Sequence, residues 1–151
     1  MFLILFEPEI PQNAGTLARL CKCFNMKMGI IEPASFLLSD RKFKRARMDY
    51  IDSENIIKYQ TFWKMKETNK NSRIILLDTK ANTNYFNINY KNSDILMVGR
   101  ESSGVPDNIF STCDITVKIP MMRETRSLNV ALSASIVVSE AQRQLGYNFN
   151  K

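Results

Sequence analysis

The sequence predicts a single α/β domain organised around a mainly parallel β-sheet. Short apolar runs with the length of buried strands alternate with longer segments of helical periodicity along the chain of 151 residues. No internal repeat, low-complexity tract or linker divides it. We therefore expect one domain over residues 1–151, long enough to bury a sizeable core.

The chain is expected to open with a strand, a helix and a second strand. Residues 2–6 (FLILF) have the unbroken apolar character of a buried strand, which EPEIPQ ends. Asn13 is a good N-cap for the helix that follows, and residues 28–33 (MGIIEP) read as a strand closed by proline. The apolar face of this first helix comprises Leu17, Leu20, Cys21 and Phe24.

Two helical segments and a strand are predicted for the middle of the chain. Residues 40–50 have a helical and strongly basic pattern, and a helix is expected over residues 54–67. Residues 73–79 (RIILLDT) form a clear strand pattern, and residues 80–93 are polar and loop-like.

The C-terminal part repeats the alternation of strand and helix. We expect strands at residues 94–99 and 114–120, with a turn and a short helix at residues 107–111 between them. A long helix ends the chain. Its apolar face comprises Val130, Ala134, Val137, Val138, Ala141 and Leu145.

A net charge of +6 and a pI near 9.3 leave two interpretations open, a polyanionic partner or a solubilising surface. The positive charge is concentrated in RKFKRAR, which supplies Arg41, Lys42, Lys44, Arg45 and Arg47. A solvated helix face would explain this cluster, but cations without an acid among them repel each other unless an anion is near. The cluster therefore favours binding to a phosphate backbone, with Phe43 or Tyr50 able to stack on a base and a core role preferred for Phe43.

The residue types that are missing exclude several classes of site. The chain has no histidine, so a Ser-His-Asp or Cys-His mechanism within it is excluded, and its Cys21, Cys23 and Cys113 predict no zinc site. An odd number of cysteines without an export signal predicts a cytoplasmic protein. No apolar run approaches the roughly 20 residues that span a bilayer, so no membrane association is expected.

Polar or glycine-bearing segments follow three of the predicted strands: LLDTK, VGRESSG and IPMMRETRSLN. Ligands of open α/β sheets gather at the carboxyl ends of strands, so together these segments predict a pocket. The chain has neither GxGxxG after its first strand nor GxxxxGK[ST], which disfavours ATP and NAD. A cofactor held by backbone contacts and apolar walls stays possible.

These segments resemble the SPOUT superfamily of RNA methyltransferases, in particular its single-domain tRNA (cytidine/uridine-34 2′-O)-methyltransferases. The resemblance runs nearly from end to end and is carried by EPEIPQNAGTLARLC, IIEPASFLLSDRKFKRARMDY, DILMVGRESSGVP and IPMMRETRSLNVALSASIVVSEAQRQLGY. It implies an α/β fold with a C-terminal deep trefoil knot, a homodimer, S-adenosylmethionine as cofactor and the anticodon stem-loop of tRNA as substrate. Small residues of the last helix, namely Ala131, Ser133 and Ala134, would allow close packing in the dimer.

The resemblance also assigns residues to roles. The cofactor contacts that it implies are Leu77, Gly99, Ile119, Met121 and Ser127. The catalytic motifs that it implies match Asn13, Arg19, Glu101, Ser127 and Asn129. Arg19 would orient the ribose hydroxyl and a phosphate, since a guanidinium is a poor base, and Glu101 would act either as a base or in positioning the first motif.

Two alternatives stay open for the function. The same chemistry could act on another tRNA or ribosomal RNA nucleotide, or the chain could be a catalytically silent knotted RNA-binding protein. The chain departs from the family pattern at Arg100, where relatives usually have proline, and at Glu124, where a more neutral loop is common. Both departures concern the details of the substrate.

Overall fold

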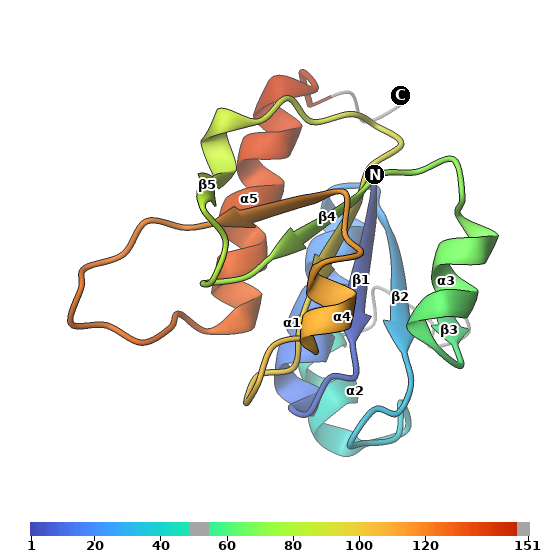
Figure 1. The fold of residues 1–151 in the computed structure, drawn as a ribbon. Helices are drawn as coiled ribbons and strands as arrows, with labels where there is room; N and C mark the ends of the chain where they lie inside the picture. Colours follow the sequence, from blue (N-terminus) through green and yellow to red (C-terminus); the bar gives the residue numbers. More distant parts are fainter. Residues whose placement is uncertain (49–54, 148–151) are drawn as a thin grey trace.

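The computed structural model of the chain describes residues 1–48 and 55–147, which form a twisted parallel sheet with helices on both faces (Figure 1). The sheet has seven strands in the order β3-β2-β1-β6-β4-β7-β5, and each pair of neighbours is parallel. This confirms the predicted fold class. The strands are β1 (Phe2–Phe6), β2 (Lys27–Ile31), β3 (Ile56–Tyr59), β4 (Ile74–Leu77), β5 (Thr83–Asn84), β6 (Ile95–Val98) and β7 (Ile115–Lys118).

Two hydrophobic cores lie on opposite faces of the sheet, because successive side chains of a strand point to opposite sides. On β1, Leu3 and Leu5 pack into the core under α1, α2 and α5, whereas Ile4 and Phe6 pack into the core under α3 and α4. The helices are α1 (Pro11–Cys23), α2 (Arg41–Arg47), α3 (Phe62–Thr68), α4 (Asp107–Phe110) and α5 (Val130–Gln144), and a short 3₁₀ helix is η3 (Tyr85–Asn87).

The prediction of a helix over residues 54–67 is confirmed only in its second part, and residue 54 lies outside the described residues. The structure has the edge strand β3 there, followed by α3, whose first turn is capped by the Thr61 side chain accepting a hydrogen bond from the Lys64 backbone N–H at 3.1 Å. The predicted loop over residues 80–93 also contains β5 and η3. Tyr50 lies outside the described residues.

The predicted apolar faces of the first and last helices are confirmed in their central parts. Leu17 and Cys21 of α1 are buried, and so are Ala134, Val137, Val138 and Ala141 of α5. Phe43 of α2 is fully buried and stacks on Phe36 with ring centroids 5.9 Å apart, which confirms its core role. Within the described part of the chain, none of the helices combines the length and the apolar character that crossing a bilayer requires.

Candidate active site

A cavity of about 600 Å³ opens at the carboxyl ends of β4, β6 and β7, bordered by the first turns of α1 and α5. Residues of all three polar strand ends line it, so the sequence predicts its place correctly. The cofactor residues implied by the resemblance are gathered here: Leu77, Gly99, Ile119, Met121 and Ser127 all lie on its wall. Ser127 belongs to the exposed segment between β7 and α5, which projects from the body of the molecule (Figure 1).

Gly99 and Gly104 shape one side of the cavity. The Arg100 backbone N–H donates to the Gly104 carbonyl at 2.9 Å, and the Gly104 N–H donates back to Arg100 at 3.0 Å, which closes a tight turn. A Cβ atom on Gly99 would lie 2.6 Å from the Gly104 carbonyl carbon, and Gly104 has φ of +67°. Since backbone cannot yield as a flexible side chain can, only glycine fits at position 99.

Glu101 is held against the first turn of α1 rather than directed into the cavity. Its Oε2 accepts a hydrogen bond from the Glu9 N–H at 2.8 Å, and its Oε1 accepts from the Ile10 N–H at 3.2 Å and the Asn13 Nδ2 at 3.1 Å. The carboxylate thus satisfies amide groups at and before the start of a helix, where negative charge is stabilised. Of the two roles left open for Glu101, this geometry favours positioning over proton abstraction.

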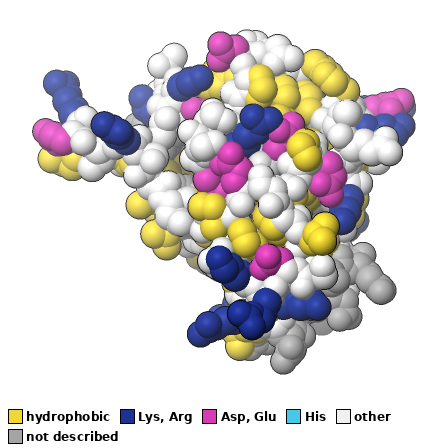
Figure 2. Space-filling view, turned by 90° about the horizontal axis from the view of Figure 1, so that it is seen from below, with side chains coloured by type: hydrophobic (Ala, Val, Ile, Leu, Met, Phe, Trp, Pro, Cys, Tyr) yellow, Lys and Arg dark blue, Asp and Glu magenta, His cyan; other side chains and the backbone are white. Residues whose placement is uncertain are grey.

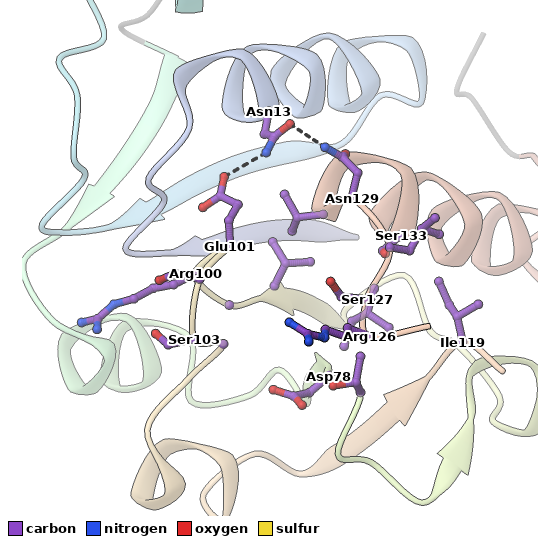
Figure 3. A pocket seen from close by; sticks show the side chains of 18 of the residues that line it. Asn13, Asp78, Arg100, Glu101, Ser103, Ile119, Arg126, Ser127, Asn129 and Ser133 are labelled. Carbon is purple, nitrogen blue, oxygen red and sulfur yellow. Dashed lines mark hydrogen bonds between the residues drawn. The ribbon is translucent and has the colours of Figure 1, made fainter. Parts of the chain in front are cut away.

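Asn13 joins the first helix to the last one. Its Nδ2 donates to Glu101, and its Oδ1 accepts from the Asn129 Nδ2 at 3.0 Å (Figure 3). Asn129 in turn caps α5, since its Oδ1 accepts from the backbone N–H of Ala131 at 2.9 Å and of Leu132 at 3.2 Å. Three residues from distant parts of the sequence therefore form one hydrogen-bonded wall of the cavity.

The prediction that Asn13 is an N-cap is wrong. The first helix begins two residues earlier at Pro11, with Ile10 in the N-cap position and no capping side-chain hydrogen bond of its own. Proline is favoured at the first helical position, because its missing N–H has no partner there in any case. Asn13 thus lies inside the first turn, 9% exposed, and its amide is left to bind Glu101 and Asn129.

Asp78 is a cavity residue to which the sequence reasoning assigned no role. It directly follows β4, and its Oδ1 accepts a hydrogen bond from the Lys80 backbone N–H at 2.9 Å. Asp78 lies in LLDTK, a polar segment after a predicted strand, and this position alone indicates a place at the cavity. Arg126 also lines the cavity and brings a positive charge to the same opening (Figure 3).

Arg19 lies outside the cavity lining, on the exposed side of α1 and nearly two turns beyond Asn13. The structure therefore brings four of the five implied catalytic residues to the cavity and its wall, with Arg19 on the adjacent surface.

The basic cluster lies on α2, which packs tightly across α1. A Cβ atom on Gly15 would lie 2.6 Å from the Phe43 carbonyl oxygen and 2.7 Å from the Ala46 Cβ, so the two helices approach closely at that point. Arg41, Lys42, Lys44 and Arg45 are exposed, and Arg47 is half-buried. Figure 2 views the molecule from the side on which α2 lies in Figure 1, and it shows Lys and Arg side chains gathered at one end of this face.

No group of three or more His, Cys, Asp or Glu side chains that could hold a metal ion occurs among the described residues.

Comparison with known proteins adds to this geometry. Residues 1–139 match the model of the SpoU rRNA Methylase family. The tRNA (cytidine(34)-2′-O)-methyltransferase of Beijerinckia indica is 45% identical over 149 residues, which cover 95% of this chain and 91% of that protein. Its counterpart in Escherichia coli K12 is 35% identical, with 96% and 94% of the two chains covered.

A solved structure described as "Structural insights into the 2-OH methylation of C/U34 on tRNA" is similar over 96% of this chain and 95% of that chain, with a TM-score of 0.91 and 34% identity.

Proposed function

This chain belongs to the SpoU rRNA Methylase family, and from this premise we propose that it is a tRNA 2′-O-ribose methyltransferase acting at the wobble nucleotide 34, a cytidine or a modified uridine. The observation that carries the proposal is its 45% identity, over nearly the full length, to a tRNA (cytidine(34)-2′-O)-methyltransferase. The hydrogen-bonded wall of Asn13, Glu101 and Asn129 beside the cavity supports an active rather than a silent protein. A tRNA substrate places the enzyme in the cytoplasm.

The cavity suits S-adenosylmethionine in size and in chemistry. Its volume of about 600 Å³ lies within the range of small-molecule sites. Leu77, Ile119 and Met121 offer apolar surface to an adenine ring, and the strand ends offer backbone groups to its polar edge. When bound, the cofactor supplies an electrophilic methyl group on a positively charged sulfur.

The residues of this chain serve mainly to position the reactants. Transfer of a methyl group requires the ribose 2′-oxygen to lie in line with the carbon and sulfur atoms, so alignment supplies much of the rate. The wall formed by Asn13, Glu101 and Asn129 fixes the first turn of α1, and Arg19 lies on the exposed side of the same helix. A guanidinium stays protonated, so Arg19 orients the hydroxyl and a neighbouring phosphate rather than removing a proton.

The basic cluster on α2 would hold the anticodon stem-loop beside the cavity. Four of its five cations are exposed, and α2 crosses α1, the helix that carries Arg19. Contacts with phosphates provide affinity without reading the base sequence, so this surface would position the RNA for the reaction.

A homodimer is supported by the apolar side chains at and after the start of α5. Leu132 is 57% exposed and Ile136 is 36% exposed, one helical turn apart on one face, and Leu128 precedes them. Of the small residues expected to serve this contact, Ala131 and Ala134 are buried in the chain's own core, and Ser133 lines the cavity. We therefore propose that Leu128, Leu132 and Ile136 form the apolar contact between the two subunits.

The deep trefoil knot that the resemblance implies is also part of the proposal. Strand β4 lies between β6 and β7 in the sheet, although it precedes both in the sequence. This order alone is common in unknotted α/β sheets, so the support for the knot is the resemblance to the SPOUT superfamily.

Incubation of the purified protein with labelled S-adenosylmethionine and total tRNA, followed by mapping of the methylated nucleotide, tests the function. We expect label on the ribose of nucleotide 34. Label on a base or on another nucleotide would overturn the assignment, and no label would favour a silent RNA-binding protein. In the same assay, Arg19→Ala should lose methyl transfer and retain tRNA binding, and full activity of this variant would refute the role of Arg19.

A further inference from the structure

The loops that leave β1 and β6 run side by side at the edge of the cavity. The two strands are neighbours in the sheet with Leu5 opposite Val98, so the residues that follow each strand are brought together. The loop after β1 leads into the first turn of α1, and the loop after β6 forms the glycine turn of the cavity wall. Any contact between these loops therefore fixes α1 relative to the cavity.

Arg100 makes such a contact with its side chain. Its guanidinium forms an ion pair with the Glu7 carboxylate and lies over the Phe6 ring, with Cζ 5.6 Å from the ring centroid. The two charged side chains are 37% and 17% exposed, so water screens their attraction less than it screens a fully exposed pair. Figure 3 shows the Arg100 side chain extending away from Ser127 and Arg126, toward the outer side of the wall.

The backbone on both sides of this ion pair is tightly constrained. Arg100 is fixed by its two backbone hydrogen bonds to Gly104. Glu7 has φ of +45°, in the left-handed region that residues other than glycine rarely adopt, and its N–H donates to the Ile31 carbonyl at 2.9 Å. An unfavourable backbone conformation beside an active site persists only where its surroundings hold it.

The two residues after Arg100 connect the same loops. Glu101 accepts hydrogen bonds from the Glu9 and Ile10 N–H groups, as described above. Ser102 donates from its N–H and its hydroxyl to the Glu9 carboxylate at 2.8 and 2.7 Å. Three consecutive residues of one loop thus bind three of the four residues that lead into α1.

From this arrangement we propose that Arg100 is a positioning residue, whose ion pair with Glu7 sets the place of the first turn of α1 and so of Asn13 and Arg19 relative to the bound cofactor. The inference rests on the proposed function, because it concerns the alignment of the methyl transfer. Arg100 also lines the cavity, and its ion pair with Glu7 occupies part of its guanidinium.

The test compares Arg100→Gln, Glu7→Gln and the exchanged pair Glu7→Arg with Arg100→Glu. We expect each single variant to lower kcat for tRNA methylation about tenfold or more, because small misplacement of reactants is costly, while the Kd for S-adenosylmethionine changes less than about threefold. The exchanged pair should recover most of the lost kcat. Lys64→Gln is the matched control, since it removes an exposed ion pair with Glu67 on α3. Single variants with wild-type kcat would overturn the proposal, and so would failure of the exchanged pair to recover activity while it remains folded by circular dichroism.

Hydrogen exchange of the Glu9 and Ile10 amides provides a second measurement that does not need catalysis. Both amides donate to Glu101, so loosening of the loop should speed their exchange in Arg100→Gln by about tenfold or more and leave it unchanged in Lys64→Gln. If the wild type methylates no tRNA, the proposed function is wrong. The exchange rates would still test whether the ion pair between Arg100 and Glu7 holds the loop in place. Unchanged exchange in Arg100→Gln would overturn that role.

Discussion

The carboxamide of Asn129 serves two parts of the structure at once. Its oxygen caps α5, and its nitrogen donates to Asn13 across the cavity wall. The two functions use different atoms, so they can be separated by substitution. Asp keeps the oxygen that caps the helix and replaces the nitrogen that donates, whereas Ala removes both.

We predict that Asn129→Ala lowers the free energy of unfolding by about 0.5–2 kcal/mol, the usual cost of losing an N-cap. Asn129→Asp should stay close to wild type in stability, because it still accepts from Ala131 and Leu132. Both variants should lose activity, since neither donates to Asn13. Urea unfolding and a methylation assay measure the two effects. An Asp variant as active as wild type would show that the link to Asn13 is dispensable.

The resemblance implies a place at the site for both asparagines, whereas the local sequence pattern misassigns how Asn13 acts. Asn13 suits a helix N-cap by residue type, and Pro11, two residues earlier, was the competing signal for the helix start. The actual partner of the first turn is Glu101, 88 residues beyond Asn13. No local pattern contains that contact, because it depends on the pairing of β1 with β6.

The strands and helices were predicted well where they are long or fully buried, and poorly at the edge of the sheet. In β3 the buried residues are Ile56 and Tyr59, with exposed residues between them. A spacing of three residues also fits one face of a helix, so this short edge strand was read as part of one. Thr61, a good N-cap directly before α3, was the signal that would have separated the two elements.

The crossing of α1 and α2 gives a prediction about the basic cluster. Gly15→Ala would place a methyl group 2.6 Å from the Phe43 carbonyl oxygen and 2.7 Å from the Ala46 Cβ, so α2 must shift. Overpacking of this kind costs about 1–3 kcal/mol. We expect a lower free energy of unfolding and severalfold weaker tRNA binding, with an unchanged Kd for S-adenosylmethionine. Gel-shift and calorimetric titrations measure the two affinities. Equal loss of both would mean that the substitution disturbs the cavity itself.

Assembly of the whole molecule is tested at the exposed face of α5. Leu132→Glu should weaken the proposed dimer at least about tenfold, because burial of a leucine stabilises an interface by about 1.5–3 kcal/mol and a buried charge opposes it. Leu37→Glu is the matched control, since Leu37 is 75% exposed and lies on a different part of the chain. Sedimentation over a range of protein concentrations measures the dissociation. A wild type that sediments as a monomer, or equal behaviour of both variants, would contradict the proposed interface.

One buried and one half-buried thiol make the stability of the whole molecule sensitive to alkaline pH. Burial raises the pKa of Cys21 from 9.0 to about 12, and burial, followed by the charge of Asp114, raises that of Cys113 to about 12. Burial also raises the pKa of the Tyr90 hydroxyl. Above pH 9 the unfolded chain releases protons from the thiols that the folded chain retains. The free energy of unfolding therefore falls as pH rises from 9 toward 12, and the stabilisation is fully present below pH 9.

For Cys21 alone the fall is about 1.4 kcal/mol per pH unit, because one proton is released on unfolding in this range. We predict that the free energy of unfolding, measured in urea with a reductant present, falls less steeply with pH for Cys21→Ala than for wild type. Between pH 9.5 and 10.5 the difference in slope should correspond to about one proton released on unfolding. Cys23→Ala, which removes an exposed thiol, is measured alongside as the control for the substitution itself. Because alanine also leaves a small void, Cys21→Ala starts from a lower stability at pH 8, and the comparison uses slopes rather than absolute values. Identical slopes for Cys21→Ala and wild type would show that the buried thiol ionises as readily in the folded chain as in the unfolded one.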